Sequence, residues 1–112
     1  MRIIEMAGIE SKVVAHGMTK VADHQINKSV GETFNYVGHV LFADTDERGD
    51  EREFVAILDD KGESWTTGSR VALEDFKDAV ADLEGEKFAF RILEGKSKTD
   101  QAFYQLKTVE WV

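Results

Sequence analysis

Residues 36–58, YVGHVLFADTDERGDEREFVAIL, contain two apolar runs of strand length joined by a charged connection. The runs at 36–43 and 53–58 flank a polar stretch that contains Gly49, which is typical of two strands and a hairpin loop. Blocks of charged residues in such a place usually form a solvent-exposed tip. These residues therefore predict the first hairpin of a mainly β domain.

The residues that follow extend this hairpin to five strands with one helix. Residues 59–62 (DDKG) give a tight-turn signal and lead into a third strand at 63–67, ESWTT. Ser69 can cap a helix from residue 70 to about residue 83, and Gly85 is placed to end it. Two more strands are expected at 87–94 and 102–112, around a second polar loop. A helix between strands 3 and 4 predicts a five-stranded, OB-fold-like barrel over residues 31–112.

The first thirty residues give a less regular pattern. Residues 12–15 and 20–26 are compatible with short strands, and 27–31 with a turn, so 1–30 are expected to be an N-terminal extension or an edge hairpin. Residues 1–8 hold too few apolar side chains for a signal peptide or a membrane span. We therefore expect one domain over residues 1–112, cytoplasmic and without a membrane partner.

The residues that carry most enzyme and metal chemistry are missing or scattered. There is no cysteine, which excludes disulfides and thiolate metal sites. His16, His24 and His39 lack the spacing of helical metal ligands, and no serine stands in a nucleophile motif. We expect no metal, no cofactor and no catalytic activity.

Charge is distributed unevenly along the chain, whose formal net charge is −8. That total argues against a protein that grips duplex DNA through broad phosphate neutralisation. However, residues 44–63 carry nine acids against three bases, whereas 87–107 carry five bases against two acids. Aromatic residues also stand near bases, as in proteins that hold single-stranded nucleic acid by stacking and phosphate contacts. Trp65, Tyr104 and Tyr36 are the candidate stacking residues.

Three short segments carry a family resemblance. In order along residues 31–109, an acidic turn, the segment 60–69 (DKGESWTTGS) before the helix, and the loop 93–98 (LEGKSK) resemble the small single-stranded DNA-binding proteins of tailed bacteriophages. The resemblance implies a sequence-independent coat for single-stranded DNA during replication or recombination, inside a bacterial host. Replication or recombination proteins and a second copy of the chain are the partners it suggests. It implicates as DNA contacts Trp65, Thr67, Ser69, Arg70, Lys96 and Lys98. With the candidate stacking residues and the remaining bases of the last two strands, the expected interface also includes Tyr36, Arg91, Tyr104 and Lys107.

A second hypothesis comes from the acids. The tip at 44–53 and the helix acids Glu74, Asp75, Asp78 and Asp82 could engage a basic surface of another protein or imitate DNA. The chain would then be an acidic interaction module, such as a phage-encoded inhibitor. The net charge of −8 favours this alternative.

Overall fold

The computed structural model describes residues 1–112, which form eight strands, two α-helices and one short 3₁₀ helix. The strands are β1 (Arg2–Ala7), β2 (His24–Gln25), β3 (Thr33–Asn35), β4 (Gly38–Thr45), β5 (Glu51–Leu58), β6 (Ser64–Thr67), β7 (Ala89–Lys96) and β8 (Ala102–Val109). The helices are α1 (Lys12–Lys20), η1 (Ile26–Lys28) and α2 (Arg70–Asp82).

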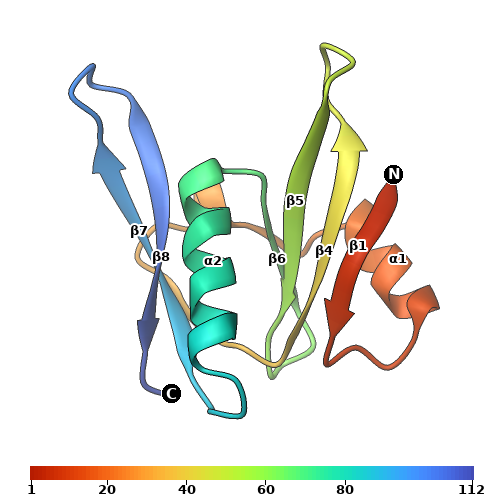
Figure 1. Ribbon diagram of the computed structural model, residues 1–112. Helices are drawn as coiled ribbons and strands as arrows, with labels where there is room; N and C mark the ends of the chain where they lie inside the picture. The colour runs from red at the N-terminus through yellow and green to blue at the C-terminus, as the bar shows by residue number, and fades with distance from the viewer.

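The strands belong to two separate sheets (Figure 1). One has the order β1-β4-β5-β6-β2 and the other the order β3-β7-β8. The prediction of a mainly β chain is confirmed, and the expected order of three strands, a helix and two strands is observed as β4, β5, β6, α2, β7 and β8. The sheets do not close into a barrel: α2 lies between β6 and β8 in Figure 1. The OB-fold is therefore not confirmed.

The main core lies between the two sheets and α2. Its largest side chains that are completely buried include Phe76 of α2, Phe90 of β7 and Ile57 of β5. A second, smaller cluster places Ala15 and Met18 of α1 against the first sheet. This second layer explains the long apolar run in β4, since a strand covered on both faces need not alternate with polar residues.

Residues 1–30 differ most from expectation. Residues 2–7 form β1, which pairs antiparallel with β4 at the edge of the first sheet. Residues 12–15 begin a helix rather than a strand, because the Ser11 hydroxyl accepts the Val14 N–H at 3.2 Å and caps it. Only His24 and Gln25 within 20–26 are in a strand, which pairs in parallel with β6. The segment is thus an edge strand and a covering helix rather than an edge hairpin.

The two long hairpins end on the same side of the molecule as the start of α2. The β4–β5 ladder continues to the pair Thr45 and Glu51, and the β7–β8 ladder to the pair Lys96 and Ala102. Figure 1 shows both hairpin tips pointing upward, with the first turn of α2 between them.

Neither α-helix is long enough to cross a bilayer, since α2, the longer of the two, has 13 residues and a crossing needs about 20.

The Asp75 side chain links α2 to β8 by a hydrogen bond, and its ionisation should make the free energy of unfolding depend on pH. Its Oδ2 atom accepts the Leu106 N–H at 3.0 Å. Burial, aided by Asp78 and Glu74, raises the pKa of Asp75 above its ordinary value of 3.8, although the Leu106 hydrogen bond opposes this. A raised folded-state pKa means that the favourable contribution is complete below the unfolded-state value and is lost as pH rises through the folded-state value.

We therefore expect Asp75→Asn to gain stability relative to the wild type as pH rises from below 3.8 to neutral. The asparagine oxygen can still accept the Leu106 N–H, so only the ionisable group is removed. Urea denaturation of both proteins over a pH series measures the difference. A difference in the free energy of unfolding that stays constant with pH would contradict this role.

Candidate nucleic-acid interface

A cleft of about 470 Å³ opens where the two sheets meet the start of α2. Its lining comes from η1, β5, the β6–α2 junction and β8. The residues are Asn27, Arg52, Phe54, Gly68, Ser69, Arg70, Val71, Ala102, Phe103 and Tyr104. Three of these, Ser69, Arg70 and Tyr104, belong to the interface expected from the sequence.

The charged side chains that line the cleft are both arginines. Arg52 is held in place, since its Nη2 atom donates to the Gly68 carbonyl at 2.9 Å and its guanidinium lies 5.6 Å from the centre of the Phe54 ring. Arg70 is 91% exposed and makes a loose ion pair with Glu74 at 3.4 Å. An exposed pair of this kind contributes only about 0–1 kcal/mol. Arg70 is therefore free to exchange Glu74 for another anion.

Two adjacent aromatic side chains of β8 give the cleft an apolar wall. Phe103 and Tyr104 are both half-buried, so neither is committed to the core. The Phe103 ring lies over Gly95 of β7, where an added Cβ atom would come within 2.5 Å of it. A side chain at position 95 would therefore displace this ring.

The third component of the cleft is the N-terminus of α2. Ser69 occupies the N-cap position, as the sequence predicts, but its side chain makes no capping hydrogen bond. The first N–H groups of a helix have no partner within the helix. Together with the helix dipole, such free N–H groups favour an anion. The structure therefore places a weakly capped helix end beside two arginines.

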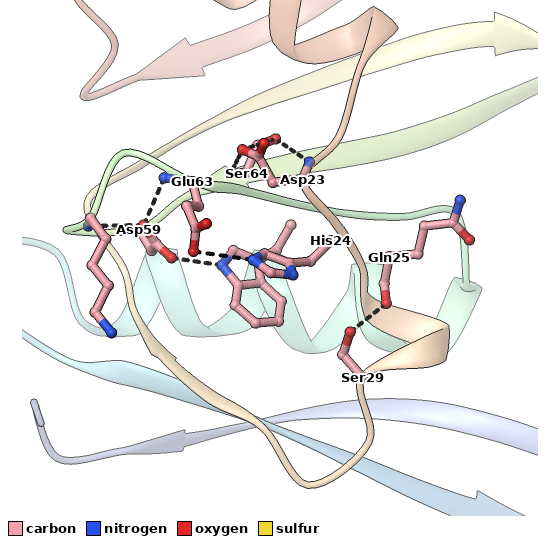
Figure 2. A network of polar contacts seen from close by, with 9 residues as sticks. Asp23, His24, Gln25, Ser29, Asp59, Glu63 and Ser64 are labelled. Carbon is pink, nitrogen blue, oxygen red and sulfur yellow. Dashed lines mark hydrogen bonds and ion pairs between the residues drawn. The ribbon is translucent and has the colours of Figure 1, made fainter.

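Trp65 does not line this cleft, which corrects its assignment as a stacking residue. The side chain is only 4% exposed, and its ring is stacked between His24 at 4.0 Å and Phe34 at 4.4 Å between ring centres. Its Nε1 atom donates to Asp59 at 2.9 Å. Figure 2 shows this corner of the fold, where Glu63 also contacts His24. With both ring faces covered, Trp65 has no surface for a base.

Thr67 is buried and Tyr36 is half-buried, and the hydroxyl of each is hydrogen bonded within the protein. The Thr67 hydroxyl donates to Asn27 Oδ1 and accepts the Ser69 N–H, both at 3.0 Å, so it shapes the turn before α2. Tyr36 packs against Phe88 and hydrogen bonds to His39. Neither of the two lines the cleft, so the structure does not bring them together with Arg70 and Tyr104.

The other lysines and arginines that the sequence places in the interface lie on β7, β8 and their loop, beyond the cleft. Lys96 and Lys98 are exposed at the hairpin tip, where Lys96 approaches Asp100 at 3.7 Å. Arg91 and Lys107 are directly opposite each other on adjacent strands, and neither makes an ion pair. Like charges in that arrangement destabilise a sheet slightly. The structure thus separates the predicted bases into a tip pair and a sheet-face pair.

No family model, curated protein or solved structure matches this chain. The resemblance to phage single-stranded DNA-binding proteins therefore stays a prediction. Function has to be inferred from the cleft and its surroundings.

The interface expected from the sequence did not include Arg52, Phe54 or Phe103. Arg52 stands in the most acidic part of the chain, and Phe54 stands in an apolar run that suggests the core. Both reach the cleft because β5 pairs with β6 and so approaches Gly68. For Phe103 the alternation along β8 was an available signal, since Leu106 and Phe103 fall on opposite faces of a strand.

Proposed function

We propose that this chain binds single-stranded DNA without sequence preference and without catalysis. The observation that carries the proposal is the lining of the cleft, which combines Arg52 and Arg70 with Phe103 and Tyr104 and includes no acid. The chain has a net charge of −8, so a cleft without acidic side chains requires an explanation. A ligand that is a polyanion with flat, apolar bases explains both its cations and its aromatic rings.

The chemistry of the cleft matches both parts of a nucleotide. Aromatic side chains stack on any base, because every base has a π-face, while cations follow the phosphates. The open N-terminus of α2 adds N–H donors for a phosphate oxygen. Stacking and phosphate contacts do not read base edges, so binding of this kind is independent of sequence.

The lysine and arginine side chains outside the cleft extend the proposed path of the DNA strand. A strand that leaves the cleft along β8 would meet Lys96 and Lys98 at the hairpin tip. Arg91 and Lys107 offer a further pair of cations on the same sheet. Because the whole molecule is acidic, long-range repulsion should make binding modest for one copy. The contacts between cations and phosphates should make it strongly dependent on salt.

The OB-like arrangement and the biological setting are parts of this proposal. The order of β4, β5, β6, α2, β7 and β8 is that of an OB-fold, whose open face commonly binds oligonucleotides. A coat protein for replication or recombination would bring the chain into contact with the enzymes of those processes. Binding side by side along one strand would also bring copies of the chain together.

The test is titration of labelled oligo-dT of about thirty nucleotides, followed by fluorescence anisotropy. We expect binding that weakens steeply between low and moderate salt, with the matching duplex bound less tightly. Arg70→Ala should lower the slope of log K against log salt by about 0.7, the value for one phosphate contact to a single strand.

Lys20→Ala is the matched control, because Lys20 is exposed on α1 and makes no ion pair. It should leave the salt slope unchanged. No binding at low salt, or equal slopes for the Arg70 and Lys20 variants and the wild type, would contradict the proposal.

One observation favours a second candidate function, the acidic interaction module. Glu74, Asp78 and Asp82 are exposed on α2, and the last two make no ion pair. Such a face can attract a basic partner protein. Asp78→Lys with Asp82→Lys should abolish capture of that partner under this alternative, whereas DNA binding through the cleft should persist.

A further inference from the structure

A second cavity, of about 560 Å³, lies at the other end of α2. It is lined by β1, β4 and the C-terminal half of α2, together with the turn at 84–86 that follows the helix. Its lining residues include Met6, Leu41, Val80 and Leu83. The volume is in the range of small-molecule sites, about 300–1,000 Å³. The DNA-binding cleft shares none of these residues, so the two sites are independent.

Aromatic rings form one side of this cavity. Tyr36 and Phe88 are stacked with 5.1 Å between their ring centres. Phe76 meets the His39 ring edge-on at 4.8 Å. Phe76 and Phe88 are buried, at 0% and 5% exposure, so they close the back of the cavity. Only the half-buried Tyr36 ring offers a face to a ligand, and the partial negative charge of such a face attracts a cation.

A chain of hydrogen bonds runs along the polar side of the cavity. His39, only 3% exposed, contacts Tyr36 Oη through Nδ1 at 2.8 Å and Glu5 Oε2 through Nε2 at 2.9 Å. A carboxylate can only accept, so Nε2 must donate to Glu5. In the neutral imidazole, Nδ1 then accepts the Tyr36 hydroxyl proton. Burial, aided by Glu5, raises the pKa of Tyr36 to about 12, so the hydroxyl keeps that proton.

The polar groups left for a ligand are consequently acceptors. The Tyr36 hydroxyl already donates its hydrogen bond to His39, and Glu5 has a second carboxylate oxygen that can accept one. Glu84 and Glu86 add two more carboxylates to the lining, and both are exposed. Lys77, the one cation of the lining, is held by Glu53 at 2.9 Å.

We propose that this cavity binds an organic cation, an ammonium or guanidinium group carried on a short apolar body. The aromatic and aliphatic walls take the apolar body. The carboxylates of Glu5, Glu84 and Glu86 and the face of the Tyr36 ring stabilise the charge. An anion would meet three carboxylates there, against the single cation Lys77, which is already paired with Glu53.

The test compares three probes with the same apolar body and different charge: phenethylamine, 2-phenylethanol and 3-phenylpropionate. Each is titrated into the full chain labelled with ¹⁵N and ¹³C in its aromatic residues, and chemical shifts are followed. We expect the amine to shift the signals of Tyr36, His39, Phe76 and Phe88 and to bind about fivefold or more tighter than the alcohol. The carboxylate should not bind.

Two double variants separate charge at the cavity from overall charge. Glu84→Gln with Glu86→Gln should weaken the amine several-fold, and Glu10→Gln with Glu110→Gln, which removes two exposed acids elsewhere, should not. A blocked Lys-Phe dipeptide distinguishes the source of the ligand: tighter binding than phenethylamine indicates a peptide side chain, and weaker binding indicates a free amine. No binding of the amine at millimolar concentration, or equal affinity for all three probes, would overturn the proposal.

Discussion

Trp65→Ala should lower the free energy of unfolding by about 3–5 kcal/mol, the range for removing a large aromatic from a core. The indole is 4% exposed, is covered by His24 and Phe34 on its two faces, and donates its N–H to Asp59. Total stabilities are typically about 5–15 kcal/mol, so this loss would be a large fraction of the whole. Equilibrium urea denaturation measures it.

Trp65→Phe is the matched control. It keeps an aromatic ring between His24 and Phe34 but leaves the buried Asp59 without its indole donor, and an unpaired buried group costs about 1–3 kcal/mol. We therefore expect intermediate stability. The opposite pattern, unchanged stability with a loss of DNA affinity in Trp65→Ala, would mean that Trp65 is a stacking residue after all.

Tyr104→Ala should weaken binding of oligo-dT by about 1–3 kcal/mol, the range measured for removing one stacked base contact. In affinity this is a loss of roughly 5- to 150-fold. Tyr104 lines the cleft and is half-buried, so the loss of stability should be smaller than for Trp65→Ala. Anisotropy titrations at one fixed low salt concentration measure the change.

Two variants show whether the effect belongs to the ring and to the cleft. Tyr104→Phe keeps the ring face and should bind as the wild type does. Trp111→Ala removes an aromatic ring that contacts Lys87 rather than the cleft, and it should also retain affinity. If Tyr104→Ala bound as tightly as Trp111→Ala, stacking on Tyr104 would have to be abandoned.

Much of the fold follows from local signals, and these were sufficient for the hairpins and α2. The turn at 59–62 is closed by Asp59, whose Oδ1 atom accepts the N–H groups of Lys61 and Glu63. Gly62 adopts a φ of 81°, which glycine tolerates best. Turns of this kind depend on neighbouring residues alone. The order of β4, β5, β6, α2, β7 and β8 could therefore be predicted.

The elements that sequence reasoning missed depend on distant partners. β1 is a strand because β4 offers it an edge, and nothing within residues 2–7 requires that pairing. At residues 12–15 the helix cap provided by Ser11 outweighs the strand propensity of Val13 and Val14. Separation into two sheets, instead of a closed barrel, depends on where α2 packs, which no local pattern specifies.

The candidate site was partly predictable for a similar reason. Arg70 and Tyr104 stand beside recognisable turns and strands, so their exposure could be anticipated. Trp65 shares their aromatic and basic surroundings in the sequence, but in β6 it pairs with the buried Ile57 and faces the core. The register between β5 and β6, which the local sequence does not show, is what places Trp65 in the core. Arg52 was overlooked because its acidic neighbours point to a solvated tip.

The measurement that tests the cleft most directly is a chemical-shift map of the ¹⁵N-labelled chain, titrated with unlabelled oligo-dT at low salt. We expect the largest shifts on Arg52, on 68–71 and on 102–104, with smaller ones at the tip lysines 96 and 98. Shifts confined to α1 or to the turn at 84–86, or a spectrum that DNA leaves unchanged, would contradict it.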